Sequence, residues 1–321
     1  LKLLPANKAR AISRAAKEVW KEKHHDQFPI DVFQTGSGTS SNMNANEVIA
    51  NLASKNSKLN IGPNDDVNMS QSSNDVIPTA IKISAHIDLT KKLYPALDKL
   101  INEIQTKAKS LKGVTKTGRT HLMDAMPIDF SDELLAWSSQ LSACRNMLEV
   151  IEERFLELPQ GGTAVGSGIN AHKQFAKFFA QEMSKILETK RKYIPSNNFF
   201  HELSAQDCSV QLSGELKNLA VILMKISNDL RWMNSGPLAG LSEIELQALQ
   251  PGSSIMPGKV NPVIPEAVTM VSADVIGNDT SITVAAQAGN FQLNVMLPVI
   301  AYNLLKSINL LAGAMNVLSN K

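Results

Sequence analysis

Long apolar seams constrain the fold of this chain more than any other feature. Over residues 134–158, apolar side chains recur alternately every three and four positions, which places them on one face of a long helix. The same spacing recurs over residues 216–233 and 304–318. A further helix is expected over residues 78–111, disturbed at Pro95, which lacks a backbone N–H. Seams of this length are typical of bundled helices, so the sequence predicts an all-α fold built on a long-helix bundle.

Composition excludes several classes of partner. The net charge of +2 is too small to favour binding to nucleic acid or to an anionic membrane. The longest clean apolar run, residues 219–224, is too short to span a bilayer. The two cysteines, Cys144 and Cys208, give neither a disulfide framework nor the spacing of metal ligands. We therefore expect a cytoplasmic protein with no nucleic-acid partner, no membrane partner and no bound metal.

The first seventy residues differ from the rest of the chain. Helices are expected over residues 3–23 and 47–55, and residues 57–66 have the polar composition of a loop. We place a soft boundary near residue 70. The sequence thus predicts an N-terminal, mostly helical domain over residues 1–70 and a bundle domain over residues 71–321.

One loop, residues 252–262, has the sequence Gly-Ser-Ser-Ile-Met-Pro-Gly-Lys-Val-Asn-Pro. We call it the signature loop. Glycine reaches backbone angles closed to other residues, and proline fixes one dihedral angle, so the segment indicates an irregular loop of defined shape. It presents hydroxyl groups, an ammonium group and an amide, which suit a carboxylate ligand and charge that develops during a reaction. The plainer interpretation is a surface turn that contains a lysine.

Three further polar clusters share this character, at residues 35–42, 70–75 and 118–121. Each is expected to precede a helix, and Pro127 and Pro265 stand where helices could begin. Serine, threonine and asparagine donate hydrogen bonds to anions without adding charge, and helix N-termini offer free N–H groups. A single such cluster is commonly only a helix cap. Four in one chain favour a dicarboxylate site.

His121 stands apart from the other histidines. It follows Gly118-Arg119-Thr120 and precedes Asp124, in a segment expected to be a loop ahead of a helix. A lone histidine is usually structural or exposed, but this polar setting favours a role in proton transfer or substrate orientation.

At these motifs the chain resembles the fumarase/aspartase superfamily, over essentially all of its length. Within that superfamily it is most similar to the class II fumarases. His121 stands where aspartases typically carry glutamine, Ser73 where they tend to have threonine, and Gly258 where they tend to have alanine. The motifs that carry the resemblance are residues 34–39, 63–68, 70–75, 118–121, 161–166, 252–262 and 289–291.

The resemblance implies reversible hydration of fumarate to (S)-malate, a reaction of the citric acid cycle, through a carbanion stabilised as an aci-carboxylate and without metal or cofactor. It implies that Ser253 is the base that removes the C3 proton of malate. Lys259 and Asn261 hold the carboxylate on which charge builds. His121 acts on the side of the water, and Glu266 pairs with His121.

Further residues are implied as ligands of the substrate carboxylates: Ser37, Gly38, Thr39, Ser72, Ser73, Asn74, Thr120 and Ser254. Asn64 and Asp65 correspond to a second anion site outside the catalytic pocket. Gly62 stands where the family usually has histidine, which puts the occupancy of that second site in doubt.

The family forms homotetramers in which the central helices of four subunits make one bundle and each active site draws segments from three subunits. The same resemblance leads us to expect that the N-terminal domain is truncated at its start and that a small C-terminal domain is absent from this chain.

Two alternatives remain open at this point. An aspartate ammonia-lyase shares the signature loop and the carbanion chemistry. A non-catalytic relative could keep the bundle for a structural or lens-like role, but such a protein need not retain Ser253, Lys259 and His121 together.

Overall fold

The computed structural model describes residues 1–320, and its contacts divide them into two compact units that we describe separately. The first unit comprises Leu1–His86, Glu153–Val210 and Ser281–Asn303. The second comprises Ile87–Glu152, Gln211–Thr280 and residues 304–320. This division follows contacts in space, whereas the boundary expected near residue 70 is a boundary along the chain, and it stays a prediction.

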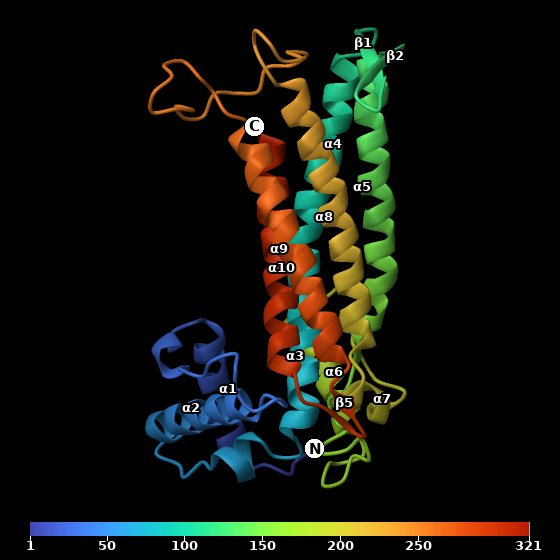
Figure 1. The fold of residues 1–321 in the computed structure, drawn as a ribbon. Coiled ribbons are helices and arrows are strands. Elements are labelled where there is room, and N and C mark those ends of the chain that lie inside the picture. Colours follow the sequence, from blue (N-terminus) through green and yellow to red (C-terminus); the bar gives the residue numbers. More distant parts are fainter. Residues whose placement is uncertain (321) are drawn as a thin grey trace. The chain divides into compact units, whose positions relative to one another are not determined.

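The second unit is the predicted helical bundle (Figure 1). Its helices run side by side in the figure: α4 (Tyr94–Ser110), α5 (Phe130–Glu152), and the greater parts of α8 (Asp207–Met233), α9 (Val263–Ala286) and α10 (Leu297–Asn320). The apolar seams form the core of this unit. Buried members include Leu134, Trp137, Leu141, Cys144, Leu148, Leu216, Leu219, Leu223, Ile226, Leu304, Ile308, Leu311 and Met315. The all-α prediction is confirmed.

Two of the expected long helices are interrupted. The helix predicted over residues 78–111 consists of α3 (Ser73–Asp88), a π-helical turn at Leu89–Leu93, and α4. The turn lies directly before Pro95, whose missing N–H removes one α-helical hydrogen bond. The seam over residues 134–158 leaves α5 at Glu152 and continues through a 3₁₀ turn into β3 (Glu157–Leu158). Pro159 disfavours a helical conformation at the residue before it.

The segment around His121 was wrongly predicted to be a loop that leads into a helix. It forms an antiparallel hairpin of β1 (Thr115–Thr120) and β2 (Met123–Asp129). Pro127 lies in β2 opposite Thr117, and the helix begins only at Phe130. Both strands of a two-stranded hairpin are edges, where proline need not remove a ladder hydrogen bond.

The first unit contains shorter elements. Its helices are α1 (Ala6–Trp20), α2 (Thr39–Ser57), most of α3, α6 (Phe175–Ile186) and α7 (Phe199–Ser204), with short helical turns at His25–Gln27 and Pro63–Val67. Short strand pairs join β3 to β4 (Ile194–Pro195) in parallel, and β5 (Gly289–Asn290) to β6 (Leu293–Asn294) in antiparallel. A small core of Ala15, Ala50, Ala53 and Ile61 packs α1 against α2.

Helix α2 begins well before the predicted residue 47. Gly38 adopts a left-handed conformation (φ 73°) as the N-cap of this helix. The polar residues that follow it find tertiary partners: Asn42 donates to the Ser73 hydroxyl (3.1 Å) and Asn46 to Asn68 (3.0 Å). Tertiary hydrogen bonding therefore keeps in a helix residues whose local preference favours a loop.

Helix α10 meets the length and composition of a membrane span, with a mean hydropathy of 1.3 over its most apolar window. The search of the sequence for uninterrupted apolar runs missed this helix, because small and polar residues interrupt its apolar ones. Its seam residues Leu304, Ile308 and Leu311 are completely buried. These residues place one face of α10 in the bundle core, and 44% of the apolar window is buried within one chain.

Candidate active site

The signature loop is closed by its own hydrogen bonds. The Gly252 N–H donates to the Lys259 carbonyl (2.8 Å), and the Asn261 side-chain amide donates to the Gly252 carbonyl (2.8 Å). A Cβ atom at Gly252 would lie 2.5 Å from the Lys259 carbonyl oxygen, so only glycine fits this crossing. Gly258 has φ 79°, a left-handed value that favours glycine. The sequence thus folds the loop into one defined shape at the start of α9.

Ser253 lies inside this closed loop and is half-buried. Its hydroxyl oxygen accepts the backbone N–H groups of Ile255 (3.2 Å) and Met256 (3.1 Å). Donors directed at an oxygen stabilise its charged form more than its neutral form. The side chains of Ser254 and Lys259 are exposed and have no hydrogen-bond or ion-pair partner among residues 1–320.

Thr120 and His121 lie at the exposed tip of the hairpin. His121 and Leu122 form the turn with φ values of 57° and 61°. Positive φ at both central residues defines a type I′ turn, which matches the twist of a hairpin but usually contains asparagine or glycine. A His-Leu turn is therefore strained, and strain of this kind is found at functional positions.

The structure does not bring His121 and Glu266 together within one chain. Glu266 is half-buried in the first turn of α9. Neither side chain makes an ion pair or hydrogen bond to the other among the described residues. Their pairing stays a prediction, and it would have to form between residues of different subunits.

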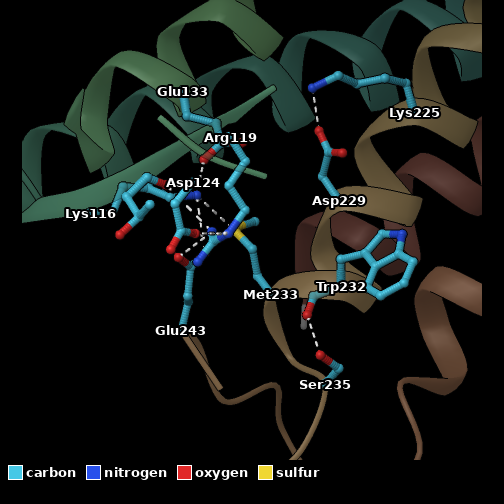
Figure 2. A network of polar contacts seen from close by, with 11 residues as sticks. Lys116, Arg119, Asp124, Glu133, Lys225, Asp229, Trp232, Met233, Ser235 and Glu243 are labelled. Atoms are coloured by element: carbon cyan, nitrogen blue, oxygen red, sulfur yellow. Dashed lines mark hydrogen bonds and ion pairs between the residues drawn. The ribbon is translucent and has the colours of Figure 1, made fainter. Parts of the chain in front are cut away.

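A network of charged side chains ties the hairpin to the segment after α8 (Figure 2). Arg119 donates to the Glu243 carboxylate (2.6 Å), and Lys116 lies 3.2 Å from the same carboxylate. Lys116 also pairs with Glu133 at the start of α5. Asp124 lies 3.6 Å from Arg119 but is largely exposed. Burial opposes ionisation of Glu243, yet the hydrogen bonds from Arg119 and Lys116 prevail and lower the pKa of this carboxyl below its ordinary value.

A cavity of about 810 Å³ adjoins this network and the hairpin. Thr120 and His121 line it together with Glu243, Asp229 and Trp232. Sequence reasoning missed Glu243, because residues 241–249 form no recognisable motif and nothing in the sequence distinguishes Glu243 from its neighbour Glu245. The predicted residues Thr120 and His121 thus face a space large enough for a small dicarboxylate.

In the first unit, two predicted clusters stand at helix N-termini. The Ser37 and Thr39 hydroxyl groups are hydrogen-bonded to each other (2.8 Å) on either side of Gly38, at the start of α2. The side chains of Ser73 and Asn74 are partly engaged: Ser73 accepts from Asn42, and Asn74 donates to the Ala164 carbonyl (2.8 Å). Backbone N–H groups in the first turn of a helix are available to bind an anion.

Asp75 is the second residue that sequence reasoning left without a role, and it organises the start of α3. It is fully buried, with 0% of its surface exposed. Its carboxylate accepts backbone N–H groups from Ser72, Gly161 and Thr163, each at 2.9 Å. Burial raises the pKa of Asp75 above its ordinary value, although these N–H donors oppose the shift. Asp75 therefore fastens the segment Ser72–Asn74 to the loop that follows β3.

The residues of the expected second anion site lie in the turn Pro63–Val67. Asn64 and Asp65 are exposed and without partners among the described residues. Their neighbour Asp66 pairs with Lys8 (2.7 Å) and accepts the Gly62 N–H (2.9 Å). The hydrogen bond from Lys8, helped by that N–H, lowers the pKa of Asp66.

Comparison with known proteins assigns the chain to a family. The family model described as lyase matches residues 1–277. Over 321 residues the chain is 55% identical to fumarate hydratase class II 2 of Pseudomonas aeruginosa, covering all of this chain and 70% of that protein. It is 56% identical to fumarate hydratase class II of Xylella fastidiosa, covering 67% of that protein. The crystal structure of class II fumarase from Schistosoma mansoni matches with a TM-score of 0.96 at 38% identity, over 99% of this chain and 70% of that one.

The bundle and the polar loops at helix starts define a lyase of the fumarase/aspartase type. The chain belongs to this lyase family, and within it to the class II fumarate hydratases. The relatives support the hydratase and not the aspartate ammonia-lyase that the sequence left open.

Proposed function

We propose that this chain catalyses the reversible hydration of fumarate to (S)-malate, with Ser253 as the base that removes the C3 proton of malate. One observation carries the assignment of the base: the Ser253 hydroxyl oxygen accepts two backbone N–H groups within a closed loop. An unassisted serine is a weak base. Donors that favour its alkoxide lower the free energy of losing the hydroxyl proton, which the proposed role requires.

The remaining catalytic groups act on the two ends of the C2–C3 bond. Removal of the C3 proton leaves an electron pair that delocalises into the adjacent carboxylate, which Lys259 and Asn261 hold. That pair then forms the double bond as the hydroxyl group leaves C2, and His121, oriented by Glu266, assists its departure as water. Hydration of fumarate follows the same steps in reverse. The side chains of Lys259 and His121 are exposed and without partners among residues 1–320, which is compatible with these roles.

Eight further residues complete the binding of the substrate carboxylates: Ser37, Gly38, Thr39, Ser72, Ser73, Asn74, Thr120 and Ser254. The starts of α2 and α3 support this proposal, because helix N-termini bind carboxylates through backbone N–H groups. Asn64 and Asp65 remain our proposal for a second anion site.

We further propose a cytoplasmic homotetramer whose active sites each draw on three subunits. Apolar side chains that one chain leaves exposed on its bundle helices support this assembly, among them Met147, Val150, Val221, Met270 and Val317. Exposed apolar residues on several faces of a bundle are typical of subunit interfaces. The separation of His121 from Glu266 within one chain fits the same arrangement.

The first experiment follows the ultraviolet absorbance of the fumarate double bond when purified protein is mixed with L-malate and, separately, with L-aspartate. Rising absorbance with malate alone supports the proposal. A rise with aspartate alone contradicts the hydratase assignment and the weight given to His121. Light scattering on the same sample tests the tetramer.

A further inference from the structure

The hairpin that carries Thr120 and His121 needs support from the rest of the chain. An isolated two-stranded hairpin is marginally stable in water, and this one has a strained turn at its tip. Its pairing also shifts register between Thr117 and Arg119. Because strand pairing alone holds the hairpin weakly, side-chain contacts with neighbouring segments must fix the positions of Thr120 and His121.

Glu243 supplies two of those contacts (Figure 2). Its backbone N–H donates to the Met233 carbonyl (2.8 Å), which anchors Glu243 to the end of α8. Its carboxylate, only 13% exposed, pairs with Arg119 at 2.6 Å and with Lys116 at 3.2 Å. Both cations belong to β1, and Arg119 directly precedes Thr120 and His121.

When the largely exposed Asp124 is left aside, the two cations Lys116 and Arg119 are balanced by Glu133 and an ionised Glu243. Lys116 has a second carboxylate partner in Glu133. Among the described residues, the other partners of Arg119 besides Glu243 are the Asp124 carboxylate and the Thr117 carbonyl, which accepts at 3.4 Å. The Asp124 side chain is 83% exposed and lies 3.6 Å from Arg119, so it cannot replace the shorter, less exposed pair. Loss of the Glu243 charge therefore removes the closest carboxylate partner of Arg119, next to the hairpin tip, while Lys116 keeps Glu133.

We propose that Glu243 is a positioning residue for catalysis: its ion pairs with Arg119 and Lys116 hold the hairpin so that Thr120 and His121 face the cavity in one orientation. The same residue lies on the segment that leads from α8 to the signature loop. This inference rests on the proposed function for the roles of Thr120 and His121. The contacts themselves do not depend on it.

The test compares Glu243→Gln with Glu245→Gln. Both remove one negative charge at nearly the same place, but Glu245 is exposed and unpartnered among the described residues. We expect Glu243→Gln to lower kcat/KM for malate by about 10- to 100-fold, the size of effect that a small misplacement of catalytic groups produces. The loss lies mainly in kcat, and the limb of the pH–rate profile that reports His121 shifts. Glu245→Gln stays within about twofold of the parent.

A second variant separates positioning from general stability. Arg119→Lys keeps the charge but loses the planar fork that pairs with Glu243. Combining it with Glu243→Gln should cost much less than the product of the two separate effects, because both break one interaction. Fully multiplicative losses, or an unchanged pH–rate profile in Glu243→Gln, would overturn the proposal.

Hydrogen exchange of the hairpin amides gives a readout that needs no activity. We expect the amides of residues 115–129 to exchange faster in Glu243→Gln, while those of α5 stay protected. If the parent protein does not turn over malate, the proposed function fails, but faster exchange still supports the positioning by Glu243. Unchanged exchange in the hairpin contradicts that positioning whatever the activity.

Discussion

Two carboxylates hold two candidate substrate-binding segments, and they do so by different physical means. Asp75 fastens Ser72–Asn74 through backbone N–H groups and is completely buried. Glu243 fastens the hairpin through the cations Lys116 and Arg119 and remains partly exposed. Burial raises the pKa of Asp75, whereas the paired cations lower that of Glu243 against a smaller cost of burial. One segment is thus fixed by peptide dipoles inside a unit, and the other by charges near its surface.

The two segments are therefore held in place by contacts of different kinds. The start of α3 is fixed by buried contacts of its own unit. The hairpin tip carries exposed catalytic candidates, which suits a group that must meet substrate or another subunit. Ion pairs that are only partly buried stabilise such a segment less than fully buried contacts would.

The largest expected effect is on catalytic turnover, and it comes from removing the proposed base rather than from disturbing either supporting carboxylate. Ser253→Ala removes the proposed base without touching Asp75 or Glu243, and should lower kcat by about 100- to 10,000-fold. Binding of fumarate should persist, because the hydroxyl group acts mainly in the transition state. Steady-state kinetics together with equilibrium fumarate binding make the measurement. Activity within a few-fold of the parent would exclude Ser253 as the base.

The next effect concerns stability in the first unit. Asp75→Asn keeps the shape but turns an amide N–H₂ toward backbone donors, leaving at least one buried N–H unpaired. We expect a loss of about 1–3 kcal/mol in the free energy of unfolding, the cost of a buried group left without its hydrogen bond. Urea unfolding of the variant beside Asp65→Asn, an exposed control in the same unit, measures the difference. Equal midpoints for the two variants would show that the buried carboxylate contributes little.

The bundle could be predicted because its signal is local and repeated. In seams such as Leu216 to Met233, the three- and four-residue spacing of apolar residues can be read from the sequence, and this spacing predicts which side chains are buried. The hairpin could not be predicted in the same way. Neither the His121-Leu122 turn nor Pro127 in a strand has the composition by which hairpins are usually found.

The candidate site could also be predicted only in part from the sequence. Its candidate residues were found because the signature loop and the polar clusters resemble a family. The residues that hold these candidates in place were not found. Asp75 accepts hydrogen bonds from the peptide groups of Gly161 and Thr163, and Glu243 pairs with cations of β1. These partners are distant in sequence, so a single sequence without its fold contains no sign of the pairing.

Acid should act on the two carboxylates in opposite directions. The pKa of Glu243 is lowered from an ordinary 4.5, so its contribution to stability is complete above that value and is lost as pH falls through the folded-state pKa. The pKa of Asp75 is raised from an ordinary 3.8, so its protonation in acid favours the folded state, and stability is lost as pH rises through the folded-state pKa.

Hydrogen exchange between pH 7 and about pH 3.5, corrected for the intrinsic rates, checks this contrast. On acidification we expect the amides of residues 115–129 to lose protection before those of residues 72–75 and 161–163. Glu243→Gln removes the titrating group, so in that variant the hairpin should already be less protected at pH 7 and change less with acid. Loss of protection in both regions at the same pH would mean that the two carboxylates report one global unfolding, and the comparison would fail.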